Sequence, residues 1–69
     1  MSLQDFTDRF VPREEVLHLT GIRSPSTIYA LIKDGDFPAP YEITRGRKGW
    51  SFTELQDWIA SRKKEARNG

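Results

Sequence analysis

Basic side chains gather at two places in this 69-residue sequence, although its formal net charge is only +1. The first group is Arg45, Arg47 and Lys48. The second group, near the C-terminus, is Arg62, Lys63, Lys64 and Arg67. Guanidinium and ammonium side chains bind phosphate, so either cluster of basic residues can contact a nucleic-acid backbone. A solvated turn or a helix C-terminus, whose dipole favours cations, explains the same clusters without a ligand. We expect a DNA contact at residues 45–48 and leave the role of the C-terminal group open.

Hydroxyl and cationic side chains recur in a short segment in the middle of the chain. They are Arg23, Ser24, Ser26, Thr27, Tyr29 and Lys33. Such groups bind phosphates and the edges of bases, and a guanidinium can bind guanine or phosphate through two hydrogen bonds. Ser26 and Thr27 also suit the start of a helix, and Tyr29 can instead cover the edge of a core. We therefore expect these residues to form a DNA-binding surface, with Arg23 as its strongest candidate.

The sequence lacks the combinations of residues that support catalysis or metal binding. It contains no cysteine, which excludes a disulfide framework and a thiolate metal site. His18 is the single histidine and has no second ligand at a metal-binding spacing, so it is interpreted as a surface or structural residue. Tyr29 lacks the arginines and histidines that would activate a tyrosine nucleophile. We expect no enzyme activity, cofactor, metal or small-molecule substrate.

The length of the chain indicates a single domain with a small core. Hydrophobic residues make up 36% of the sequence, which is enough for one modest core and too little for a deep substrate cavity. No apolar run approaches the roughly 20 residues that cross a bilayer, and residues 1–10 do not resemble a signal peptide. The sequence therefore predicts a cytoplasmic protein without a membrane partner, and whether Met1 to Leu3 are native stays open.

A first short helix is predicted between Pro12 and Gly21. Proline suits a first helical turn, the acids at positions 14 and 15 complement the helix dipole, and glycine suits the end. The apolar spacing places Val16 and Leu19 inward, with Leu17 at their flank.

A second helix is predicted over residues 24–34. Ser24 is a suitable N-cap and Pro25 suits the first helical position. Ile28, Leu31 and Ile32 follow at i, i+3 and i+4 and form one apolar stripe. Gly35 and then Pro38 end the helix.

A β-hairpin and a last helix are predicted for the remainder of the chain. The segments YEIT and GWSF alternate as short strands do, and residues 45–48 form the loop between them. A capping box at residues 53–56 begins the last helix, whose inward stripe is Leu55, Trp58 and Ile59. We expect Trp50 and Trp58 to belong to the core.

Two short helices joined by a tight turn, a basic two-stranded hairpin and a packing helix describe a winged helix-turn-helix. The predicted fold class is therefore mainly α with a small β-hairpin: three helices and a two-stranded wing. Residues 1–10 are interpreted as a flexible N-terminal arm, residues 11–65 as the domain and residues 66–69 as a frayed C-terminus.

The segments VPREEVLHLTGI, STIYALIKDGDFPAP and GWSFTELQDWIASR resemble the AlpA-like prophage regulators and related small excisionases, which have a MerR-like winged helix fold. The resemblance covers residues 11–62. It implies a sequence-specific DNA-binding protein that activates prophage genes or bends DNA during excision.

The expected partner is double-stranded DNA, with helix 24–34 in the major groove and wing 45–48 on the backbone or in the minor groove. Because one small module buries little DNA surface, self-association or cooperative binding on repeated sites is expected. The alternative is a protein-interaction module of the antirepressor type with the same fold. A contiguous exposed apolar patch and salt-insensitive affinity would favour that alternative.

Overall fold

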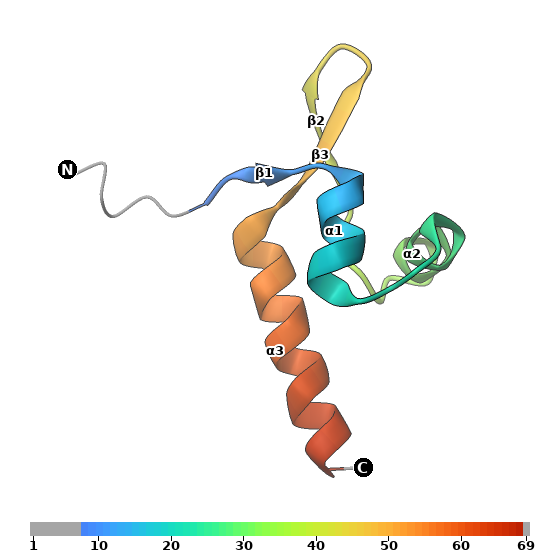
Figure 1. Ribbon diagram of the computed structural model, residues 1–69, viewed down its shortest axis with the longest axis vertical. Helices are drawn as coiled ribbons and strands as arrows, with labels where there is room; N and C mark the ends of the chain where they lie inside the picture. The colour runs from blue at the N-terminus through green and yellow to red at the C-terminus, as the bar shows by residue number, and fades with distance from the viewer. Residues whose placement is uncertain (1–7, 69) are drawn as a thin grey trace, which may run out of the picture.

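The computed structural model describes residues 8–68. Its elements are β1 (Phe10–Val11), α1 (Arg13–Thr20), α2 (Pro25–Lys33), β2 (Tyr41–Thr44), β3 (Arg47–Ser51) and α3 (Phe52–Asn68). The hairpin of β2 and β3 lies at one end of the molecule and α3 reaches to the other, with α1 and α2 beside the middle (Figure 1). The predicted class is confirmed: three helices and a small antiparallel sheet, consistent with a winged helix-turn-helix. Within the described residues, no helix combines the length and hydropathy needed to span a bilayer.

A single core holds these elements together. Every element except β2 contributes one buried apolar side chain, and Phe37, which follows α2, adds another. The full set is Val11, Val16, Ile28, Phe37, Trp50 and Leu55. Trp50 is 2% exposed, and its indole N–H donates to the carbonyl oxygen of Pro38 over 2.9 Å. Trp50 therefore belongs to the core as predicted, whereas Trp58 is half-buried and packs against the core through the ring of Phe37.

The first helix confirms its predicted ends and corrects its predicted inner face. Pro12 has an extended backbone before α1, and Gly21 ends the helix with a φ of 77°. Val16 is fully buried, but Leu19 is 39% exposed and Leu17 packs against the core instead. Leu17 and Leu19 lie on opposite sides of Val16 around the helix. Which side is covered depends on the elements that pack there, and periodicity does not contain that information.

The second helix forms as predicted. Ser24 Oγ accepts a hydrogen bond from the Ser26 backbone N–H over 3.2 Å, and Pro25 is the first helical residue. Ile28 is fully buried, while Leu31 and Ile32 pack at the edge of the core. Gly35, with a φ of 79°, reverses the chain after α2. This reversal allows Phe37 to enter the core.

The sheet has a strand that the sequence analysis did not predict. Its order is β1-β3-β2, and Phe10 and Val11 in β1 pair with Ser51 and Trp50 in β3. Phe10 was assigned to the N-terminal arm, and this was wrong. Residues 1–7 of that predicted arm lie outside the described residues. A two-residue strand is too short to show the alternation by which strands are recognised in a sequence. Its pairing partner is also distant in the chain.

The hairpin loop is shorter than predicted. Arg47 already pairs with Thr44, so only Arg45 and Gly46 connect the two strands. Gly46 has a φ of 80°, a left-handed backbone conformation that glycine adopts without a side-chain clash. Arg47 and Lys48 therefore belong to β3 and not to the loop.

The last helix begins earlier than predicted. It begins at Phe52, which was assigned to a strand, and it extends to Asn68. Ser51, not Thr53, supplies the capping hydroxyl: its Oγ accepts from the Glu54 backbone N–H over 3.2 Å. The Thr53 N–H donates to Asp8 Oδ1 over 3.1 Å. A carboxylate from before β1 thus completes the cap, which no local sequence pattern indicates.

Candidate nucleic-acid interface

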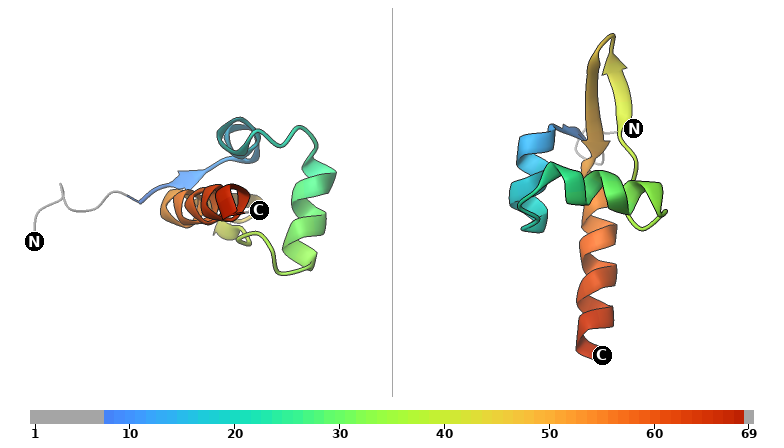
Figure 2. Two further views of the ribbon diagram at one scale, coloured as in Figure 1. Left: turned by 90° about the horizontal axis from the view of Figure 1, so that it is seen from below. Right: turned by 90° about the vertical axis from the view of Figure 1, so that its right-hand side faces the viewer.

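The outer face of α2 is exposed and carries polar side chains. Ser26, Ala30 and Lys33 follow at i, i+4 and i+7, opposite the buried Ile28, and all three are exposed. Tyr29 lies at the edge of this face and is 48% exposed. In the right-hand view of Figure 2, α2 crosses in front of the molecule and the hairpin rises above it. One side of the protein therefore presents both α2 and the hairpin.

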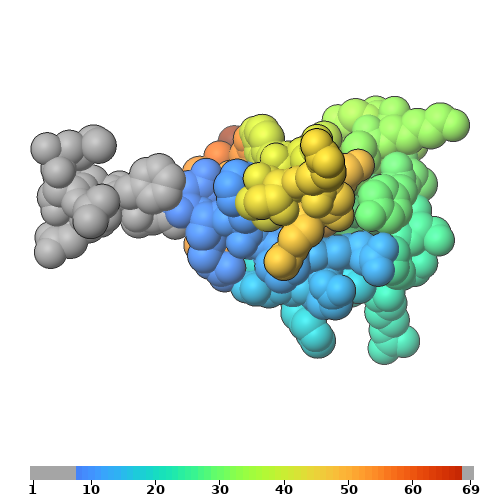
Figure 3. All heavy atoms as spheres, turned by 90° about the horizontal axis from the view of Figure 1, so that it is seen from above, coloured from blue at the N-terminus to red at the C-terminus, as the bar shows by residue number. Residues whose placement is uncertain are grey.

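A surface hollow of about 420 Å³ joins three elements on that side. We call it the wing–helix hollow. It is lined by Pro12, Arg13, Glu14, Tyr29, Gly46, Arg47, Lys48 and Trp50. Figure 3 shows the hairpin standing between the start of α1, in blue, and α2, in green. The hollow lies where the start of α1, the middle of α2 and the hairpin meet.

The wing–helix hollow is strongly basic. Arg13, Arg47 and Lys48 bring three positive charges to it, and Glu14 brings one negative charge. The ion pairs found among residues 8–68 join Arg9 to Glu15 and Arg62 to Glu65. Within that range, none of the three cations of the hollow forms an ion pair, although Glu14 lines the hollow and Glu42 is the cross-strand partner of Lys48. A basic hollow of this kind attracts an anion, and the Tyr29 hydroxyl adds a hydrogen-bond donor.

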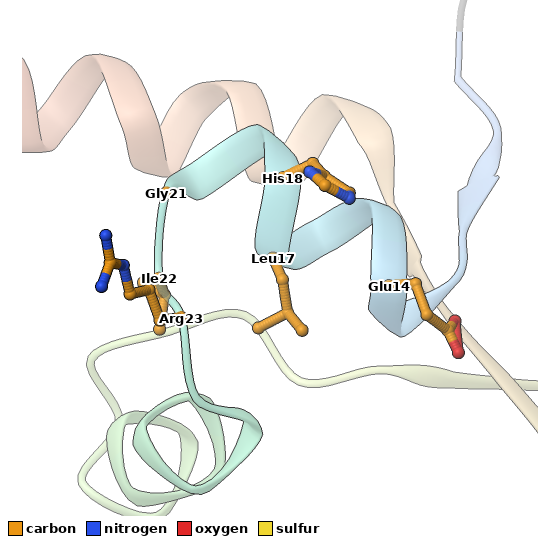
Figure 4. A pocket seen from close by; sticks show the side chains of 6 residues that line it. All are labelled: Glu14, Leu17, His18, Gly21, Ile22 and Arg23. Carbon is orange, nitrogen blue, oxygen red and sulfur yellow. The ribbon is translucent and has the colours of Figure 1, made fainter.

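A second hollow, of about 480 Å³, lies between α1 and the chain that leads into α2. It is lined by Glu14, Leu17, His18, Gly21, Ile22 and Arg23. In Figure 4 the side chain of Leu17 points into the hollow, whereas Glu14 and Arg23 lie at opposite ends and point apart. The guanidinium of Arg23 therefore extends from the surface just before α2 begins.

The structure brings together three of the predicted DNA-binding residues. Tyr29, Arg47 and Lys48 line the wing–helix hollow. Arg23 lines the neighbouring hollow, which shares Glu14 with the first.

The other predicted residues lie around these three. Ser26 and Thr27 are exposed on the first turn of α2, and the Ser24 hydroxyl caps that helix. Arg45 is exposed in the turn next to Gly46. Lys33 is near the other end of α2, roughly 14 Å along the helix from Ser24.

Arg13 is the residue of this surface that sequence analysis missed. It begins α1, and α1 packs against β3, which places Arg13 beside Arg47 and Lys48. Arg9, four positions earlier, is the nearest other base in the sequence, so Arg13 belongs to neither of the two basic groups seen there. His18 lines the second hollow, and no group of three potential metal ligands occurs among residues 8–68.

Comparison with known proteins identifies relatives of this chain. Residues 9–63 match a family described as prophage CP4-57 regulatory protein (AlpA), a family of regulators and not of enzymes. The uncharacterized protein ORF88 of Enterobacteria phage P4 is 41% identical over 63 residues, which cover 90% of this chain and 70% of the phage protein. No solved structure matches the chain. The family match spans nearly all of the folded domain, and the chain therefore belongs to the AlpA family of prophage regulatory proteins.

Proposed function

We propose that this protein binds double-stranded DNA with sequence specificity, as a prophage-type transcriptional regulator or an excisionase-like architectural factor. In this proposal α2 enters the major groove and the β2–β3 wing contacts the backbone or the adjacent minor groove. The wing–helix hollow carries the proposal, because it makes Tyr29 of α2 and the wing residues Arg47 and Lys48 parts of one basic surface.

The outer face of α2 suits contact with base edges. A major groove about 12 Å wide admits one helix, and the exposed side chains of Ser26 and Lys33 can form hydrogen bonds there. Ala30, between them on the same face, can pack against a thymine methyl group. Arg23 and Thr27, at the start of α2, supply further contacts to phosphate or bases.

The basic residues around α2 and the wing predict steeply salt-dependent binding. Arg23, Lys33, Arg45, Arg47 and Lys48 are all exposed. If these cations neutralise about five phosphates, log Kd changes with log salt concentration with a slope of roughly 4.5. Binding then weakens about 500-fold between roughly 50 and 200 mM salt.

Fluorescence anisotropy on labelled DNA from the protein's own upstream or attachment region tests this proposal. We expect salt-dependent binding by the wild type, and a weaker, less salt-dependent complex for Arg47→Ala. Arg67→Ala is the matched control, because it removes the same charge near the far end of α3. Absence of binding at low salt would overturn the proposal for that DNA. Equal losses for the two variants would mean that removal of either positive charge weakens binding to the same extent, which would contradict a contact specific to the wing.

Several copies on repeated sites are part of the proposal. One module of this size covers little DNA, so high specificity benefits from adjacent copies. Footprinting across a protein titration should show protection that extends over repeated sequences. Protection confined to one short site at saturation would contradict this expectation.

An exposed apolar patch favours the antirepressor-type alternative as a second candidate. Phe10, Tyr41 and Ile43 are 50%, 46% and 42% exposed. The rings of Phe10 and Tyr41 lie 6.1 Å apart, and Phe10 and Ile43 both approach Gly49. These residues form the contiguous patch that a protein partner would cover. A complex with a phage or host protein that persists at high salt and is lost in Ile43→Asp would support this candidate.

A further inference from the structure

A protein that occupies two adjacent grooves of DNA must accommodate the strand between them. In B-DNA, one sugar–phosphate backbone separates each major groove from the neighbouring minor groove. A helix in the major groove and a wing at the next minor groove therefore lie on either side of that backbone. The space between helix and wing has to admit a chain of phosphates.

The wing–helix hollow occupies this space in the structure. Tyr29 lines it from α2, and Gly46, Arg47 and Lys48 line it from the hairpin. Arg13 lines it from the start of α1. Its position is therefore the one that the backbone between two contacted grooves requires.

We propose that the wing–helix hollow binds a backbone phosphate of the DNA duplex, and that Arg13 is a direct contact to this phosphate. The inference rests on the proposed DNA-binding function and adds a residue and a ligand group to it. Three cations and a phenolic hydroxyl match the needs of a phosphodiester, which carries one negative charge and accepts several hydrogen bonds.

Glu14 places one negative charge in the hollow, beside its three positive charges. It follows Arg13 in the first turn of α1 and lines the same hollow, where it repels a phosphate. The two neighbouring residues should therefore affect DNA affinity in opposite directions. A purely structural role in α1 would give the reverse signs, because the helix dipole favours Glu14 and disfavours Arg13 at the helix N-terminus.

The first test measures DNA binding by Arg13→Gln and Glu14→Gln, with circular dichroism melting curves to confirm folding. We expect Arg13→Gln to weaken binding about tenfold and to lower the salt slope by about 0.9. Glu14→Gln should strengthen binding, and Arg13→Lys should restore most of the slope because it keeps the charge. Unchanged affinity in Arg13→Gln, or weakening in both glutamine variants, would overturn the assignment.

The second test locates the phosphate on the DNA. Single backbone phosphates are replaced in turn by neutral methylphosphonates, and each duplex is titrated with the wild type and Arg13→Gln. At one position, the methylphosphonate should weaken binding of the wild type relative to the unmodified duplex. The same replacement should not weaken binding of Arg13→Gln, because this variant already lacks the contact to that phosphate. If every methylphosphonate that weakens binding of the wild type weakens binding of Arg13→Gln equally, the contact between Arg13 and a phosphate is overturned. The DNA-binding function would be unaffected by that result. Failure of the wild type to bind any unmodified duplex would overturn both proposals together.

Discussion

The hydroxyl of Ser51 lies 2.9 Å from Oδ2 and 3.0 Å from Oδ1 of Asp8, a residue 43 positions earlier in the chain. Asp8 also accepts a hydrogen bond from the backbone N–H of Thr53, and Ser51 Oγ accepts one from Glu54. The segment before β1 is thereby attached to the first turn of α3. These hydrogen bonds, above all the one from Thr53, hold the pKa of the Asp8 carboxyl below its ordinary value of 3.8.

The first prediction concerns stability in acid. Because the folded-state pKa of Asp8 is lowered, its carboxylate stabilises the fold above pH 3.8, and this contribution is lost as the pH falls through the lower folded value. Asp8→Asn should therefore have a lower free energy of unfolding than the wild type at neutral pH. This difference, or gap, should disappear as the pH falls below about 4. Urea unfolding at a series of pH values measures this gap.

Glu15→Gln is a second test of the acid sensitivity. The hydrogen bond from Arg9 lowers the pKa of Glu15, so Glu15 adds to the acid sensitivity in the same direction. When both substitutions are combined, the free energy of unfolding should depend less on pH in the acid range than it does with either substitution alone. A constant gap between Asp8→Asn and the wild type from pH 7 to pH 2 would contradict the role of Asp8.

The second prediction concerns Gly49, where the wing strand is closely covered. A Cβ at this position would lie 2.6 Å from Ile43 Cδ1 and 3.1 Å from Phe10 Cβ. Gly49→Ala should destabilise the fold by about 1–3 kcal/mol through overpacking. In thermal unfolding, Ile43→Val, which lacks the Cδ1 atom, should recover part of this loss when combined with Gly49→Ala. Additive effects of the two changes would indicate that the clash lies elsewhere.

The third prediction separates the structural role of Ser24 from DNA binding. Ser24→Ala removes the cap of α2 and should lower the free energy of unfolding by about 1 kcal/mol. Ser24→Asp keeps a capping oxygen and should preserve stability, but its charge should weaken DNA binding by repelling phosphate. Denaturant melts and DNA titrations of the two variants measure both effects. Normal DNA affinity in Ser24→Asp would place this residue away from the backbone.

The fourth prediction compares two leucines of α1. Leu17 packs against the core and Leu19 is exposed. Leu17→Ala should lower the free energy of unfolding by about 2 kcal/mol, and Leu19→Ala by no more than about 0.5 kcal/mol. Equal losses in thermal or denaturant unfolding would contradict the orientation of α1 in the structure.

Local chemistry in the sequence was sufficient to predict much of the fold. Ser24, Pro25 and the Ile28 stripe define α2 within one short segment, because capping and helical periodicity act between residues at most a few positions apart. The absence of cysteine, the wing bases and the motifs shared with AlpA-like regulators were likewise visible in the sequence. These features also indicated the family and the exposed side chains of α2 and the wing.

Tertiary structure decided the features that depend on distant segments. The pairing of Phe10 with Ser51, the Asp8 cap on α3 and the burial of Leu17 in preference to Leu19 each require partners remote in sequence. The wing–helix hollow is the same kind of feature. Arg13 joins Arg47 and Lys48 only because α1 packs against β3. Sequence periodicity describes one element at a time, and packing between elements determines which of its side chains meet.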